Sequence, residues 1–330
     1  MTDQSKIPLP SDAKRGSEGS SLIERAVKAF DLGKLNPPPV PEQLAAAART
    51  LVREEPVVQQ PAEEAQSAPA AAAPAASQPV RPVQFSGESH PVDRDLLREQ
   101  GMIVPEGTVT GLLEEFRIIK RQILQQAADL RRQGGGPAAQ RVLVCSPHPG
   151  EGKTYCSVNL ALAIAAEKEG EVVLVDADFA KPSILSVLGL PGGPGLMDAL
   201  SDPSADIADF VIGTDVPGLW VLPAGNATNT DSEYLNSSRT SGVLDRLTEG
   251  APRRMVIFDS PPALAASPAA ELAKYVGQAV MVARAGTTSQ GAIEDARSLL
   301  SGCPNIQLLL NATQFSPSGR SFGSYYGYGS

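Results

Sequence analysis

Beyond residue 110, short apolar runs alternate with segments of helical periodicity along the chain. Short, continuous apolar runs that are joined by helices are typical of strands buried on both faces of a parallel sheet. The strand candidates are RVLVCS (141–146), EVVLVDAD (171–178), LWVLPAG (219–225), RMVIFDSPP (254–262), QAVMVARAG (278–286) and IQLLLN (306–311). The pattern therefore predicts an α/β fold, with a doubly wound, mainly parallel sheet flanked by helices.

Two amphipathic helices are predicted ahead of the first strand. The longer one, GLLEEFRIIKRQILQQAADLRRQGGG (111–136), ends at a run of glycines. The shorter one, SLIERAVKAFDLG (21–33), has five apolar residues at helical spacing: Leu22, Ile23, Ala26, Val27 and Phe30. Two interpretations of this short helix stay open with equal weight. It packs loosely on the folded domain, or it docks on another protein.

Composition divides the chain into four parts. Residues 1–35 are mostly polar apart from the short helix, and residues 36–92 are rich in proline and alanine. Such a linker cannot bury enough apolar surface to offset the entropy lost on ordering, and its prolines make it stiff. We therefore predict a disordered start (1–35), a linker (36–92), a folded domain (93–313) and a flexible, tyrosine-rich tail (314–330).

Composition also excludes several classes of function. The net charge of −9 and the pI near 4.9 argue against a surface that binds nucleic acid. The chain has no CxxC pair and only two histidines, which argues against a zinc site. Cys145, Cys156 and Cys303 are therefore expected to be buried, reduced thiols. The N-terminus lacks a signal-peptide core, and no apolar run is long enough to cross a membrane. We expect a cytoplasmic protein whose contact with a membrane comes through a partner or through its surface.

The segment RVLVCSPHPGEGKTYCSVNL has the arrangement of a phosphate-binding loop. A predicted strand leads into a loop (146–152), and a helix is predicted to start near Lys153. Gly150 and Gly152 allow backbone N–H groups to turn inward around an anion, and the helix N-terminus adds further N–H groups. Lys153 can reach the β- and γ-phosphates of a nucleotide, and Thr154 can ligate Mg²⁺.

The loop departs from the strict Walker A pattern at its first position. That pattern has a glycine five positions before Gly152, where this chain has Pro147. The GxGK[ST] part and the strand–loop–helix context are both present. The alternative, a chance glycine turn, does not explain that context, so the segment predicts a nucleotide-binding loop.

Aspartates end two of the predicted strands. Asp176 and Asp178 follow the run EVVLV, and Asp259 follows RMVIF. Ligands bind at the carboxyl ends of strands in a doubly wound sheet, so these carboxylates are expected to converge on the loop, as a Walker B aspartate does to hold Mg²⁺. The period of two in a strand would place Asp176 and Asp178 on the same face. The alternative is capping of the following helix, which fits Asp178 but not all three aspartates.

Together these segments resemble the motifs of bacterial tyrosine kinases. SPHPGEGKT, VVLVDADFAKPS and VIFDSPPAL are similar to the Walker A, Walker A′ and Walker B motifs of that family, which is related to the ParA/MinD ATPases. The resemblance covers roughly residues 93–330 and looks closest to the subfamily linked to exosortase/PEP-CTERM exopolysaccharide loci. That subfamily also has a helix like SLIERAVK, a variable linker and a segment like residues 101–121 here. The resemblance implies a P-loop NTPase fold and a protein-tyrosine autokinase that uses ATP and Mg²⁺.

The site residues of the family carry over onto matching positions. The resemblance implies that the nucleotide is bound by Pro149, Gly150, Glu151, Gly152, Lys153, Thr154, Tyr155 and Asn311. It implies that Mg²⁺ and its waters are held by Thr154, Asp178 and Asp259. Lys153, Asp176 and Asp178 would be catalytic. Asp176 is the candidate that accepts the proton of the tyrosine hydroxyl, whose pKa is ordinarily about 10, but the division of labour between Asp176 and Asp178 is open.

The C-terminal stretch FGSYYGYGS matches the tyrosine cluster that members of this family phosphorylate in trans. It holds three of the six tyrosines of the chain, Tyr325, Tyr326 and Tyr328, among glycines and serines that supply no core. Exposed tyrosines on a flexible end are explained if they are the phosphoacceptors. A tail without a role would leave their position unexplained.

Family members also assemble into rings through a helix with an ExxRxxR motif. Here the motif reads Glu114, Arg117 and Lys120, and lysine lacks the bidentate guanidinium that arginine supplies. Ala180 stands where relatives often have arginine. His148 stands where ParA/MinD proteins carry their signature lysine, which favours the kinase family over the partition ATPases.

The resemblance implies that the chain phosphorylates its own tail and regulates exopolysaccharide synthesis and export. Its partners would be further copies of itself and a separate transmembrane polysaccharide co-polymerase, which recruits it to the inner face of the plasma membrane. No nucleic-acid partner is expected. The alternatives are a ParA/MinD-type ATPase switch, which has no use for clustered tyrosines, and a nucleotide-binding scaffold, which would not need the intact aspartates.

Overall fold

The structure is a computed structural model that describes residues 81–226 and 231–313. These residues belong to one compact unit of the chain. The predicted helix at 21–33, most of the predicted linker and the tyrosine tail lie outside the described residues. The interpretations given for those segments therefore stay predictions.

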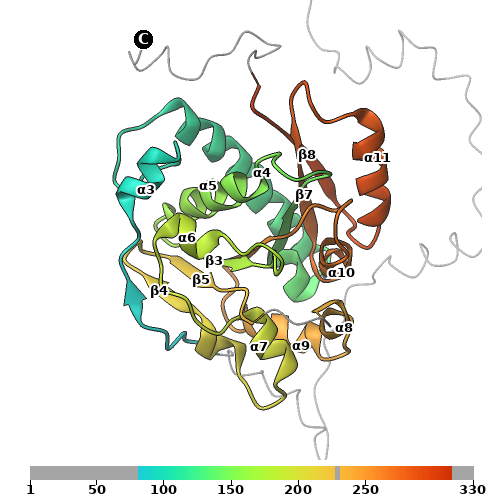
Figure 1. Ribbon diagram of the computed structural model, residues 1–330. Helices are drawn as coiled ribbons and strands as arrows, with labels where there is room; N and C mark the ends of the chain where they lie inside the picture. Colours follow the sequence, from blue (N-terminus) through green and yellow to red (C-terminus); the bar gives the residue numbers. More distant parts are fainter. Residues whose placement is uncertain (1–80, 227–230, 314–330) are drawn as a thin grey trace, which may run out of the picture. The chain divides into compact units, whose positions relative to one another are not determined.

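An eight-stranded sheet runs through the described domain, in the order β1-β4-β5-β3-β6-β2-β7-β8 (Figure 1). The predicted strands are all present, as β2 (Arg141–Cys145), β3 (Glu171–Asp176), β5 (Leu219–Leu222), β6 (Arg254–Asp259), β7 (Gln278–Arg284) and β8 (Ile306–Asn311). Neighbouring strands of this sheet are parallel, except that β4 (Ile212–Thr214) is antiparallel to β5. The prediction of a doubly wound, mainly parallel α/β sheet is confirmed.

Two short strands were not predictable from the hydrophobic pattern. β1 (Ser89–His90) has two residues and β4 has three, and neither contains a run of apolar residues. β1 pairs with β4, so that Ser89 lies opposite Gly213. At such lengths the tertiary pairing decides the conformation, because local propensity in strands is weak.

Residues 81–92 belong to the folded domain, although their composition assigns them to the linker. Val83 is buried, and its carbonyl accepts a hydrogen bond from the Arg254 guanidinium at 3.1 Å. The same guanidinium lies 4.2 Å from the centre of the Phe85 ring, which packs edge-on against Trp220 at 5.2 Å between ring centres. The predicted boundary at residue 92 is therefore wrong, because these contacts come from residues far away in the sequence.

Helices cover both faces of the sheet (Figure 1). One face carries α3 (Arg94–Glu99), α4 (Gly111–Arg132), α5 (Lys153–Ala165) and α6 (Ile184–Leu188). The other carries α7 (Leu196–Ser201), α8 (Asp231–Leu235), α9 (Thr240–Arg246), α10 (Pro268–Leu272) and α11 (Gln290–Leu299). Along β3, Val172 and Leu174 join the first core, and Val173 and Val175 join the second. Two cores on one strand explain why the strand sequences are apolar throughout.

The long helix predicted before the first strand is α4. The Thr110 side chain caps it by accepting the Leu113 N–H at 3.2 Å. Three apolar residues on its inner stripe are buried: Phe116, Ile123 and Ala127. The helix ends shortly before Gly134, whose φ of 85° suits glycine. None of the described helices, α4 included, is both long and apolar enough to cross a membrane.

Lys120 of α4 lies inside the domain. Only 6% of the residue is exposed, and its ammonium group pairs with the Glu167 carboxylate. The hydrogen bond and the charge of Lys120 lower the pKa of the Glu167 carboxyl. In contrast to the prediction, Lys120 is therefore not available to a neighbouring subunit. Glu114 and Arg117 pair with each other at partly exposed positions of the same helix.

The three cysteines are buried and free of disulfides, as predicted. Burial raises the pKa of the Cys145 and Cys156 thiols to about 12. A thiol with so high a pKa carries almost no thiolate at neutral pH, so these residues serve packing and not chemistry.

Replacing Ile123 by alanine is expected to destabilise the domain by about 2–5 kcal/mol, because it leaves a cavity beneath α4. Ile123 has no exposed surface, whereas Ile118 on the same helix is 37% exposed. Ile118→Ala is the matched control and should cost less than about 1 kcal/mol. Urea unfolding followed by circular dichroism measures both losses. Equal losses of unfolding free energy in the two variants would contradict the burial of Ile123 and the exposure of Ile118 on α4.

Candidate nucleotide-binding and phosphoryl-transfer site

The predicted site residues gather at the carboxyl ends of three adjacent strands. β2 runs into the phosphate loop, β3 ends in Asp176 and β6 ends in Asp259. In the sheet, Asp259 lies opposite Val144 of β2 on one side and opposite Asp176 of β3 on the other. The expected convergence of the carboxylates on this edge is confirmed.

The phosphate loop (146–152) has the backbone conformation of an anion cradle. Gly150 and Gly152 have φ of 78° and 95°, which other residues rarely adopt. Within the described part of the chain, no group accepts a hydrogen bond from the backbone N–H of Gly150, Glu151 or Gly152. These donors and the first turn of α5 are therefore available to a phosphate.

Pro147 is compatible with this loop. Among residues 146–152, only Gly150 and Gly152 adopt the left-handed conformation. Pro147 is buried, and its carbonyl accepts the Leu264 N–H at 3.3 Å. The conformation of this loop thus does not need the first glycine of the strict Walker A pattern.

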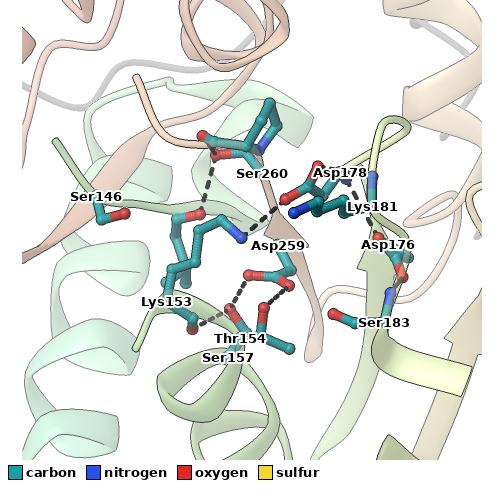
Figure 2. A network of polar contacts seen from close by, with 12 residues as sticks. Ser146, Lys153, Thr154, Ser157, Asp176, Asp178, Lys181, Ser183, Asp259 and Ser260 are labelled. Atoms are coloured by element: carbon teal, nitrogen blue, oxygen red, sulfur yellow. Dashed lines mark hydrogen bonds and ion pairs between the residues drawn. The ribbon is translucent and has the colours of Figure 1, made fainter. Parts of the chain in front are cut away.

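Lys153, the first residue of α5, points across the site toward the segment that follows β3 (Figure 2). Its ammonium nitrogen lies 2.8 Å from Oδ2 of Asp178. Both side chains are largely enclosed, with 16% of Lys153 and 7% of Asp178 exposed. A phosphate in the loop would compete with the Asp178 carboxylate for the lysine charge.

Asp259 is the buried carboxylate of the site. Its Oδ2 accepts the Thr154 hydroxyl at 2.7 Å, and its Oδ1 accepts the Ser157 hydroxyl at 2.9 Å (Figure 2). Burial raises the pKa of the Asp259 carboxyl to about 7, although the charge of Lys153 and the two hydroxyls lower it. A bound cation would favour the ionised form that burial disfavours.

Ser157 is a site residue that the motif did not identify. It follows Thr154 by three positions on α5, which brings both hydroxyls to one face of the helix. Both bond to Asp259. The helical period of α5 could have identified Ser157, whereas the Walker A motif ends at Thr154.

Asp176 and Asp178 have different partners, although these partners belong to α6 and α5, which cover the same face of the sheet. β3 ends at Asp176, so Asp178 lies beyond the strand. Oδ2 of Asp176 accepts the N–H groups of Ser183 at 2.8 Å and Ile184 at 3.0 Å, where α6 begins. Helix capping, the alternative considered for Asp178, is the observed environment of Asp176. Burial raises the pKa of the Asp176 carboxyl despite these bonds.

The other residues predicted to bind the nucleotide lie around the loop. Asn311, the last residue of β8, donates from Nδ2 to the Glu151 carbonyl at 2.9 Å. The Tyr155 hydroxyl donates to the Gly101 carbonyl at 2.8 Å, so its side chain is directed away from the loop. Pro149 is exposed. Their contacts with a nucleotide stay predictions.

The oxygen atoms of the site suit Mg²⁺. This ion prefers one or two carboxylates together with hydroxyl and phosphate oxygens. The Thr154 hydroxyl and the Asp259 carboxylate lie side by side, and the Asp178 carboxylate is held nearby by Lys153. The described residues contain no cluster of three His, Cys, Asp or Glu side chains that would hold a metal alone. The donor set therefore fits an ion that is completed by phosphate oxygens.

A parallel sheet, a glycine loop with free N–H groups, and a lysine among strand-end aspartates define a P-loop nucleotide-binding protein. Tyrosine-protein kinase YwqD of Bacillus subtilis (strain 168) is 30% identical to the chain over 217 residues, which are 65% of this chain and 85% of that protein. At this identity and coverage, the chain belongs to the family of bacterial tyrosine-protein kinases.

Further comparisons agree with this membership. Tyrosine-protein kinase ptk of Acinetobacter johnsonii is 29% identical over 153 residues, which are 46% of this chain but 20% of that protein. The chain thus spans about a fifth of the length of this relative. The crystal structure of the chimerical protein CapA2B2 superposes with a TM-score of 0.53 at 25% identity, and covers 69% of this chain and 94% of its own. No family model matches the chain.

The pKa of Asp259 predicts how the stability of the metal-free protein changes with pH. Because the pKa is about 7 in the folded state and ordinarily 3.8, the folded protein keeps this proton over a range in which the unfolded chain loses it. Stability therefore falls as the pH rises through that range. Asp259→Asn cannot ionise, so relative to wild type it should gain about 3 kcal/mol between about pH 5 and about pH 8.

Urea unfolding in the presence of EDTA, at both ends of this range, measures the change. Asp295→Asn removes an exposed carboxylate of α11 and is the control, which should follow wild type at both pH values. If the difference between Asp259→Asn and wild type stays constant with pH, the burial of an ionisable group at this position is refuted.

Proposed function

We propose that the chain is an ATP-dependent protein-tyrosine autokinase, which transfers the γ-phosphoryl group of ATP to tyrosines of its own tail in trans. The observation that supports it best is the site: Lys153 and Asp178 pair across a loop whose N–H groups are free within the described residues, and Asp259 lies beside Thr154. Two relatives are named tyrosine-protein kinases.

The side chains of the site would position ATP and balance its charge. The loop N–H groups and Lys153 would hold the β- and γ-phosphates. Thr154, Asp178 and Asp259 would hold Mg²⁺, which when bound neutralises charge on the phosphates. Phosphoryl transfer asks little covalent chemistry of the protein, so positioning and electrostatics would supply the catalysis.

We assign the acceptor of the tyrosine proton to Asp178. Asp176, the candidate from the family resemblance, is 1% exposed and caps α6 through Oδ2, while its Oδ1 accepts the Asp178 N–H at 3.2 Å. Its oxygens are thus occupied by backbone donors. Oδ1 of Asp178 accepts the Lys181 N–H at 3.2 Å, but its Oδ2 bonds to the Lys153 ammonium group, which a phosphate would draw away. Asp178 would then be free to serve the ion and the proton.

The position at which the tail begins supports its role as substrate. The last described residue, Thr313, follows Asn311 by two positions, and the Asn311 side chain is bonded to the phosphate loop. Tyr325 lies twelve residues beyond Thr313, over which an extended chain can reach roughly 40 Å. We propose that this length lets the tail enter the site of an adjacent copy. The proposed phosphoacceptors are Tyr325, Tyr326 and Tyr328.

We also propose that the chain acts with a separate transmembrane polysaccharide co-polymerase, at the inner face of the plasma membrane, to regulate exopolysaccharide synthesis and export. The support is the resemblance of the sequence to the subfamily linked to exopolysaccharide loci. The kinase domain would extend over residues 81–313. Glu114 and Arg117 stay candidates for contacts in a ring of copies, since both are partly exposed on α4.

Transfer between chains is testable with two complementary variants. Lys153→Met keeps the tail but loses the cation that holds the phosphates. A triple Tyr→Phe variant at 325, 326 and 328 keeps the site but loses the acceptors. With γ-labelled ATP and Mg²⁺, each variant alone should take up less than about a tenth of the wild-type label. A mixture of the two should restore phosphotyrosine on the Lys153→Met chain.

The other outcomes of this experiment identify the alternatives. Hydrolysis of ATP by wild type without any protein labelling would refute the kinase and favour an ATPase switch. Binding of ATP with neither hydrolysis nor labelling would favour a scaffold. Labelling of wild type without labelling of the mixture would show that transfer stays within one chain.

The ion pair between Lys153 and Asp178 predicts an opposite effect of Asp178→Asn on binding and on transfer. Without the competing carboxylate, ATP in EDTA should bind about tenfold more tightly. With Mg²⁺, phosphoryl transfer should fall at least about tenfold, because the variant loses a ligand of the ion and the acceptor of the tyrosine proton. Asp295→Asn removes the same charge from α11 and should change neither quantity. Weaker metal-free binding by Asp178→Asn, measured by calorimetry, would argue against this competition.

A further inference from the structure

Glu151 places a buried carboxylate inside the phosphate loop. Only 3% of the residue is exposed, so both oxygens need hydrogen-bond donors to offset their burial. Oε2 accepts the backbone N–H of His148 at 2.9 Å, within the loop. Oε1 has its donor outside the loop, in the hydroxyl of Thr288.

A second contact of Thr288 defines the direction of its bond to Glu151. Thr288 Oγ1 accepts the backbone N–H of Arg284 at 2.8 Å. The hydroxyl hydrogen is therefore available to Glu151 Oε1, an acceptor that has no proton of its own to give when ionised. A chain of hydrogen bonds thus runs from the end of β7 through Thr288 into the phosphate loop.

The turn that carries Thr288 is held in place by the backbone. It connects β7 to α11, on the side of the sheet where β8 lies (Figure 1). The N–H groups of Thr287 and Thr288 donate to the Arg284 carbonyl at 3.1 and 3.0 Å. The N–H of Ala285 donates to the Asn311 carbonyl, at the end of β8, at 2.9 Å. Thr288 therefore reaches the loop from a fixed support.

Side chains from β7 and β8 also bond to the outer carbonyl groups of the loop. The Arg284 guanidinium donates to the Gly150 carbonyl at 3.3 Å, and the Asn311 amide donates to the Glu151 carbonyl at 2.9 Å. In a trans peptide the C=O of one residue and the N–H of the next point in opposite directions. Holding these two carbonyls outward keeps the N–H groups of Glu151 and Gly152 directed into the cradle.

We propose that Thr288 is a positioning residue for nucleotide binding. Its hydroxyl holds the Glu151 carboxylate, and through Glu151 it holds the loop in the conformation that presents the backbone N–H groups to the phosphates. This assignment rests on the proposed function of the site. Thr288 lies 137 residues beyond Glu151 and outside every motif of the loop.

Loss of this donor acts on nucleotide binding more than on the fold. A Glu151 carboxylate that has lost the donor of its Oε1 would turn this oxygen toward water, and the loop would leave its preorganised conformation. Nucleotide binding would then have to restore the order of the loop, which weakens affinity. The turn itself would keep the backbone bonds that Thr287, Thr288 and Ala285 donate.

The test compares Thr288→Val, which keeps the shape but lacks the hydroxyl, with Thr288→Ser, which retains it. Thr287→Val is the matched control, because Thr287 is exposed and its side chain makes no hydrogen bond to any described residue. Calorimetry measures the Kd for ADP with Mg²⁺. Thr288→Val should raise it about tenfold, whereas Thr288→Ser and Thr287→Val should stay within about twofold of wild type.

Two further readouts separate positioning from a structural role. Without nucleotide, Thr288→Val and Thr288→Ser should melt within about 2 °C of each other. In the labelling assay, Thr288→Val should raise the KM for ATP about tenfold and leave the rate at saturating ATP within about twofold of wild type.

The assignment is overturned if Thr288→Val binds ADP like wild type, or if the serine variant loses affinity to the same extent. A loss of affinity matched by an equally large loss of thermal stability also overturns it. If wild type binds no ADP, the proposed function itself fails, and this inference fails with it. If wild type binds ADP and Thr288→Val binds equally well, only the role of Thr288 is refuted.

Discussion

The bonds between the Asp259 carboxylate and two hydroxyls of α5 are the contact on which the site depends. Asp259 ends a central strand and is fully buried, and a carboxylate in such a place is stable only when its oxygens are bonded. Thr154 and Ser157 supply those bonds. They fix the start of α5 to the end of β6, and since β2 is the neighbour of β6, the loop between β2 and α5 must cross the edge of the sheet at this point. The anion cradle follows from that constraint.

The three aspartates are held by different sets of donors, and Asp178 alone is paired with a cation. Backbone N–H groups at the start of α6 hold Asp176, the Lys153 ammonium group and the Lys181 N–H hold Asp178, and hydroxyls hold Asp259. Of these donors, only the Lys153 ammonium group carries a charge, and a bound phosphate could replace the Asp178 carboxylate as its partner. The opening of this one pair would free both a cation for the phosphates and a carboxylate for the ion and the proton. The phosphate loop is itself bonded to the Thr288 and Asn311 side chains, in the turn after β7 and at the end of β8, which no local motif contains.

The apolar runs of the sequence predict some parts of this fold, whereas other parts depend on contacts between residues that are distant in the sequence. The six longer strands could be predicted because each is buried on both faces, and burial of that kind shows in a continuous apolar run. β1 and β4 could not, because strands of two and three residues depend on their partners. The packing of residues 81–92 could not be predicted either, because Val83 and Phe85 are held by Arg254, which lies far away in the sequence. In the same way, the partner of Lys120 within the chain, Glu167, belongs to the segment that follows α5.

The sequence by itself determined the fold class, the phosphate loop and the aspartates at the strand ends. Those features are encoded by neighbouring residues: apolar runs, glycines at two left-handed positions, and a lysine at the start of a helix. Only the tertiary structure decided that Asp176 caps a helix while Asp178 pairs with Lys153, that Ser157 joins the site, and that Thr288 supports the loop. The physical reason is that a hydrogen-bond partner is chosen by distance and direction in space, and the sheet brings together strand ends that lie far apart along the chain.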